Sequence, residues 1–126
     1  MKKLREDIGN YYCSKTYTSD GMNIVELLNS LSEEYEAMRV RVNEDVEFEQ
    51  KTIDKTEYPI DEFYDKMEQI ALVGSNQYYT IIGGYRGETA EITLHEVNQL
   101  ITLVTTDKNL EIDQLIQKKS KGFGFK

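Results

Sequence analysis

The chain has 126 residues, of which 39% are hydrophobic and 30% charged, and it carries a formal net charge of -8. This length and composition are typical of one folded domain and exclude a disordered chain. The single cysteine excludes an internal disulfide, and no apolar run reaches the roughly 18 residues that a membrane span needs. Because no apolar segment follows the basic residues at the start, we expect a cytoplasmic protein.

Residues 22–37 have the apolar spacing of an amphipathic helix. Apolar side chains recur every three or four positions, at Ile24, Leu27, Leu28, Leu31 and Tyr35. Asp20 or Asn23 can cap the N-terminus of such a helix with a side-chain oxygen. The spacing therefore predicts a helix over 22–37.

Residues 38–50 change to a period of two, which is typical of strands. If two short runs pair across a loop at 43–45, every facing pair matches in kind: Val42 with Val46, Val40 with Phe48, Arg41 with Glu47, and Arg39 with Glu49. A slip of one residue would turn arginines into the core, so the charges specify the register. We predict a β-hairpin over 38–50.

A continuous helix is the alternative for this region. Apolar residues keep a 4-3-4-3 spacing from Ile24 to Val42, which is typical of a coiled-coil seam. The spacing fails at the next two positions, Asp45 and Glu49, and alternating valine and arginine favours a strand. The hairpin is the preferred interpretation, and the seam stays open beside it.

The next two elements have clear local signals. Pro59 precedes a stretch with helical apolar spacing and an acidic first turn, which predicts a helix over 60–72. Two β-rich runs then follow, joined by a glycine-rich turn. They predict a second hairpin over 77–93.

The last part of the chain is predicted to be helical. Thr93 and Glu96 have the spacing of a capping box, which predicts a helix start and a helix over 94–106. Further apolar spacing predicts a helix over 110–119. The tail 118–126 is basic and rich in glycine, and we expect it to be mobile.

These elements together predict an α+β fold. The expected architecture is a small antiparallel sheet built from the two hairpins at about 38–50 and 77–93, packed with three to four helices. No repeat or linker divides the chain, so residues 1–126 are expected to form a single domain with the mobile tail at its end.

The residue inventory argues against an enzyme. One histidine, His95, and one cysteine, Cys13, are too few for a common zinc site, and no local spacing pairs them. Carboxylates are plentiful, but none has the spacing of a known metal loop. We therefore expect no catalytic residues, no metal and no cofactor.

A central acidic block is the feature that most favours a binding function. Residues 33–68 carry 13 acidic and 5 basic side chains, a net of -8, whereas both ends of the chain are basic. Such a block repels phosphate and favours a cationic protein partner, although it can also serve only for solubility. Tyrosines inside the block suit protein contacts. The predicted partner-binding residues are Glu44, Asp45, Glu47, Glu49, Asp54, Glu57, Tyr58, Asp61, Glu62, Tyr64, Asp65 and Glu68.

The leading functional hypothesis is therefore a non-enzymatic acidic inhibitor of the phage or mobile-element type. Its carboxylates would stand in for phosphates on a basic partner, a nuclease or other nucleic-acid-binding protein, without direct contact with nucleic acid or membrane. Anti-CRISPR proteins and nuclease immunity proteins act in this way as classes, and no motif assigns the chain to one such family.

Two alternatives come from other classes. A glycine-rich turn holding Gly83, Gly84, Tyr85 and Arg86 could bind a nucleotide or small anion, which would make the chain a sensor or sponge. The turn matches no known phosphate-binding motif, and a hairpin needs glycine anyway. The other alternative is a self-assembling structural or virion subunit, a homo-oligomer whose chains pair through the seam at 24–42.

Overall fold

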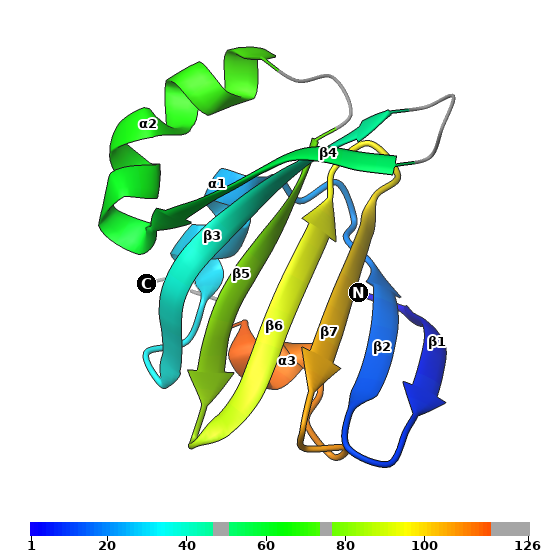
Figure 1. The fold of residues 1–126 in the computed structure, drawn as a ribbon. Coiled ribbons are helices and arrows are strands. Elements are labelled where there is room, and N and C mark those ends of the chain that lie inside the picture. Colours follow the sequence, from blue (N-terminus) through cyan, green and yellow to red (C-terminus); the bar gives the residue numbers. More distant parts are fainter. Residues whose placement is uncertain (47–50, 74–76, 117–126) are drawn as a thin grey trace, which may run out of the picture.

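The chain folds around one seven-stranded antiparallel sheet (Figure 1). The computed structural model describes the backbone of residues 1–46, 51–73 and 77–116. It describes the side chains of these residues except those within 43–56 and 68–77. The elements are β1 (Lys3–Ile8), β2 (Cys13–Thr18), α1 (Ile24–Ser30), β3 (Tyr35–Val46), β4 (Lys51–Pro59), α2 (Ile60–Val73), β5 (Gln77–Tyr85), β6 (Glu88–His95), β7 (Leu100–Thr105) and α3 (Ile112–Leu115).

The strand order explains how the chain assembles the sheet. The order is β1-β2-β7-β6-β5-β3-β4, and every neighbouring pair is antiparallel. The last three strands form a central meander, and the two earlier hairpins, β1–β2 and β3–β4, flank it on opposite sides. Figure 1 shows α1 and α3 behind the sheet, so these helices cover one sheet face, and among the described residues no helix lies in front of β6 and β7.

The core lies between the sheet and the helices. Alternate residues of β6 and β7, including Ile92, Leu94 and Leu103, are buried on the covered face. Helix α1 adds Leu27 to the same cluster, and α2 adds Phe63. This alternation is the expected pattern for an antiparallel sheet with one face packed against the core. No helix among the described residues is long and apolar enough to cross a membrane.

The predicted fold class is wrong. The described residues are mostly strand and form one seven-stranded antiparallel sheet with few short helices, rather than two hairpins packed with three to four helices. The helix predicted over 22–37 ends at Ser30, and the chain enters β3 at Tyr35. The coiled-coil seam at 24–42 is therefore wrong as well, because its second half is a strand.

The helix predicted over 94–106 is the largest error. This segment contains the end of β6, a turn and the whole of β7. Thr93 lies within β6, and the Glu96 carboxylate accepts a hydrogen bond from the Ile24 N–H at 2.7 Å, so it binds the start of α1, whose N-cap is Asn23, instead of capping its own segment. Of the helix predicted over 110–119, only Ile112–Leu115 is helical among the described residues.

The first hairpin exists with a different register. The predicted loop at 43–45 lies inside β3, and Arg41 pairs with Glu57 rather than with Glu47. The longer hairpin is favoured because β4 supplies a second run of strand-forming residues and β3 pairs β5 on its other side. The hairpin over 77–93 and the helix over 60–72 are confirmed as β5–β6 and α2.

Candidate functional site

The described part of the acidic block lies along one edge of the sheet, the edge formed by β3 and β4; this edge is called the acidic end below. Strands β3 and β4 are neighbours at that end, and α2 follows β4 directly and contacts both strands. In Figure 1, β3 and α2 lie at the left and the β1–β2 hairpin lies at the right. The described acidic residues of β4 and α2 thus lie on neighbouring elements.

The predicted partner-binding residues divide into three groups. Glu47 and Glu49 lie outside the described residues. The backbone of β3, β4 and α2 is described, but not the side chains of Glu44, Asp45, Asp54 and Glu68. The described side chains are those of Glu57, Tyr58, Asp61, Glu62, Tyr64 and Asp65.

Three of these six side chains are engaged within the chain. Arg39 Nη1 and Arg41 Nε donate to the two Glu57 carboxylate oxygens, each at 2.8 Å, and these bonds hold the pKa of Glu57 below its usual value. Glu62 pairs with Lys66 at 3.0 Å. Tyr58 is half-buried and its ring packs against Phe63, 6.4 Å between centroids. The charges of Glu57 and Glu62 are neutralised within the chain and the Tyr58 ring is packed, so these residues offer less to a partner than the sequence suggests.

Helix α2 presents the other three side chains to solvent. Asp61, Tyr64 and Asp65 are all exposed, Tyr64 to 44%. Spacings of three and four place them on one helix face, and neither aspartate forms an ion pair with a described residue. Asp61 lies in the first turn of α2, where a carboxylate stabilises the helix, whereas Asp65 lies one turn later and repels Asp61 across four residues. We call these three residues the α2 patch.

The glycine-rich turn is held by contacts within the chain. Arg86 and Gly87 both have positive φ, 52° and 84°, as a tight two-residue hairpin turn requires. Arg86 Nη2 donates to Glu34 Oε2 at 2.7 Å, and the Tyr85 hydroxyl donates to the same carboxylate at 3.2 Å. An anion at Arg86 would therefore have to compete with Glu34.

The two earlier glycines of this stretch lie in β5 rather than in the turn. A side chain on Gly83 would come within 2.5 Å of the Glu36 carbonyl oxygen. Gly83 is thus needed for the close approach of β3 and β5. Ligand binding by Gly83, Gly84, Tyr85 and Arg86 stays a prediction.

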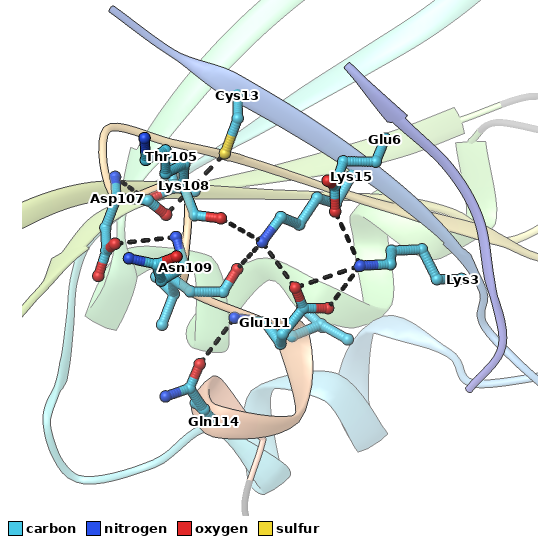
Figure 2. Close-up of polar contacts among 12 residues, drawn as sticks. Lys3, Glu6, Cys13, Lys15, Thr105, Asp107, Lys108, Asn109, Glu111 and Gln114 are labelled. Carbon is cyan, nitrogen blue, oxygen red and sulfur yellow. Dashed lines mark hydrogen bonds and ion pairs between the residues drawn. The ribbon is translucent and has the colours of Figure 1, made fainter. Parts of the chain in front are cut away.

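A buried lysine is the polar centre that the sequence did not reveal. Lys15 lies on the covered face of β2 and is fully buried. Figure 2 labels Lys108 and Glu111 beside Lys15. Its ammonium donates to three acceptors, the carbonyl oxygens of Lys108 (2.8 Å) and Leu110 (2.7 Å) and the carboxylate of Glu111 (2.7 Å). All three N–H donors are therefore satisfied.

Glu111 is the shared acceptor of this cluster. It also accepts hydrogen bonds from the Tyr17 hydroxyl at 2.9 Å and from the Lys3 ammonium at 3.2 Å. Figure 2 shows Lys3 and Lys15 on either side of the Glu111 carboxylate contacts. Burial alone would raise the pKa of Glu111, but the hydrogen bonds from Lys15, Tyr17 and Lys3 outweigh it and lower the pKa to about 2. Burial raises the pKa of Tyr17 to about 12. The cluster links the segment before α3 to the β1–β2 hairpin, so its role is structural.

Among the described residues, no three His, Cys, Asp or Glu side chains lie close enough together to hold a metal ion. The chain matches no protein-family model, and searches of curated proteins and of solved structures find no significant match.

Proposed function

We propose that the chain is a non-enzymatic binding protein whose acidic end occupies a basic protein partner. The observation that supports it is the position of the α2 patch, two carboxylates without described ion pairs around an exposed tyrosine, at the end of the sheet that holds the acidic block. In such a patch the carboxylates attract arginine and lysine, and the tyrosine buries much area at little entropic cost.

The partner class follows from the sign and clustering of the charge. Proteins that handle nucleic acid have cationic surfaces shaped to bind phosphates, and an acidic end can occupy such a surface in place of the phosphates. The proposal thus includes inhibition of a nuclease or other nucleic-acid-binding protein, as in the anti-CRISPR and immunity-protein classes from phages and mobile elements. It also includes action in the cytoplasm, without direct contact with nucleic acid.

The test is affinity capture from cell extract with three matched baits. One is the unchanged chain, the second carries Asp61→Lys and Asp65→Lys, and the third carries Glu26→Lys and Asp113→Lys, the same change in charge at exposed positions of α1 and α3. A partner retained by the first and third baits, lost from the second and displaced by double-stranded DNA supports the proposal. Equal retention by all three baits contradicts it.

Salt dependence gives a second readout on the same captured protein. Contacts between exposed charges weaken as the Debye length falls from about 10 Å at 0.1 M salt to about 3 Å at 1 M. We expect retention to fall at least about tenfold over this range if charge pairs dominate the contact. Retention that is independent of salt would show that the acidic end does not carry the interaction.

A further inference from the structure

The sheet face opposite α1 and α3, here called the open face, carries a row of four threonines, of which Thr80 is buried and the other three are half-buried. Thr16, Thr102, Thr93 and Thr80 lie directly opposite one another on β2, β7, β6 and β5. Their hydroxyls form two hydrogen-bonded pairs, Thr16 with Thr102 (3.3 Å) and Thr80 with Thr93 (3.0 Å). Each pair has two hydroxyl hydrogens and uses one between its members, so each pair retains one O–H donor and several lone pairs for another molecule.

A shallow recess lies beside this row. Its volume is about 290 Å³, and it is lined by Tyr78, Thr93, His95, Asn98, Leu100 and Thr102. This volume lies at the lower end of the range for ligand sites, roughly 300 to 1,000 Å³, so the recess fits one small ring rather than an extended ligand.

Two stacked rings form one side of the recess. Tyr78 and His95 are opposite each other on β5 and β6, and their rings stack with centroids 5.6 Å apart and planes 20° from parallel. The Asn98 N–H donates to His95 Nδ1 at 3.2 Å, which holds the imidazole in this orientation. The backbone of the turn between β6 and β7 therefore fixes one ring of the stack.

The lining selects the charge of a ligand. None of its six residues is Asp, Glu, Lys or Arg, and the chain as a whole has a net charge of -8. A phosphate would find no lysine or arginine among these lining residues and would be repelled by the overall field. A charged amine would find no carboxylate among them. The recess therefore favours a neutral molecule.

The lining also selects the polarity of a ligand. Hydroxyl groups of Thr93 and Thr102 and the exposed Asn98 amide can donate and accept, whereas Leu100 and the ring stack offer apolar surface. A molecule that matches both needs hydroxyls around its edge and an apolar face. A sugar ring has this combination, because its hydroxyls point outward and its C–H bonds form a flat face.

We propose that this recess is a binding site for a neutral saccharide. One sugar ring packs against the Tyr78–His95 side, and its hydroxyls bond to Thr93, Thr102 and Asn98. This site lies on the open sheet face and shares no residue with the α2 patch, so saccharide binding does not depend on binding of a partner at the acidic end.

The test uses saturation-transfer NMR with the full chain and a panel of neutral sugars: glucose, galactose, mannose, N-acetylglucosamine and their short oligomers. Adenosine monophosphate is the anionic comparison. The key variant is Thr93→Val with Thr102→Val, because valine keeps the shape and strand preference of threonine and removes only the hydroxyl. Thr89→Val, at an exposed position of β6, is the matched control.

The expected result is saturation transfer to at least one neutral sugar, with affinity lowered about tenfold or more in the double variant, since two hydrogen-bonding hydroxyls are lost. The Thr89→Val control should bind as the unchanged chain does. Circular dichroism establishes that both variants are folded. Transfer only to adenosine monophosphate, transfer to no sugar, or equal binding by the double variant would each overturn the proposal.

Discussion

Replacing Lys15 by methionine tests the role of the buried cluster. Methionine keeps the length and most of the volume of the lysine side chain and removes its ammonium. The carbonyl groups of Lys108 and Leu110 then each lose a donor, and Glu111 loses one of its partners. The variant therefore isolates the polar contribution with little change in packing.

The size of the effect follows from the surroundings of each acceptor. A buried carbonyl left without a donor costs about 1–3 kcal/mol, and the Leu110 bond is buried whereas the Lys108 bond is partly exposed. The Glu111 side chain is 38% exposed and keeps Tyr17 and Lys3, so it adds little. The variant no longer buries an ammonium, which offsets part of the loss. We expect the free energy of unfolding to fall by about 2–3 kcal/mol.

Urea denaturation followed by far-UV circular dichroism measures this change. For a domain of this size the expected loss corresponds to a melting temperature lower by about 10 °C. Lys66→Met is the control, because Lys66 forms an exposed pair within α2 and its loss should leave the urea midpoint nearly unchanged. A loss below about 1 kcal/mol in Lys15→Met would refute the reasoning, since it would mean that the two carbonyls find other donors.

Three further predictions concern single contacts. The pKa of Glu111 is about 2 in the fold and 4.5 ordinarily, so its stabilisation should be present above pH 5 and lost toward pH 2; Glu111→Gln should flatten that part of the stability profile, and an unchanged slope would contradict it. Gly83→Ala should destabilise by about 1–3 kcal/mol in urea, because the new methyl meets the Glu36 carbonyl; a neutral result would show that β3 can shift. Glu96→Ala should remove the cap of Ile24 and weaken the fold by about 1 kcal/mol, with faster amide exchange confined to α1.

Local signals in the sequence were sufficient for two elements. The acidic first turn after Pro59 belongs to α2, and the glycine-rich stretch joins β5 to β6. Both depend on neighbours in sequence. The structure of segment 94–106 does not depend on them alone. Its apolar residues recur every three or four positions, at Leu94, Val97, Ile101 and Val104, as in a helix, and the pairing of β7 with β2 decides for a strand.

The candidate sites were predictable to different degrees. The acidic block is visible in composition, but Glu57 proved to be neutralised by two arginines that only the true register brings next to it. Lys15 lies midway between Cys13 and Tyr17 in an alternating run, a position that period two assigns to the core, but lysine is rarely buried unless it is paired. The open-face recess combines residues of three strands and a turn, so no local pattern could reveal it.

The position of the meander has a consequence for the order of folding. Strands β5, β6 and β7 form the middle of the sheet but come last among the strands in the chain, and Cys13 of β2 pairs with Thr105 of β7. During synthesis the two outer hairpins therefore emerge before the strands that join them, with an unfilled gap between their inner edges. Closing such distant pairings costs loop entropy before contacts repay it, which predicts refolding on the millisecond-to-second scale of high-contact-order proteins.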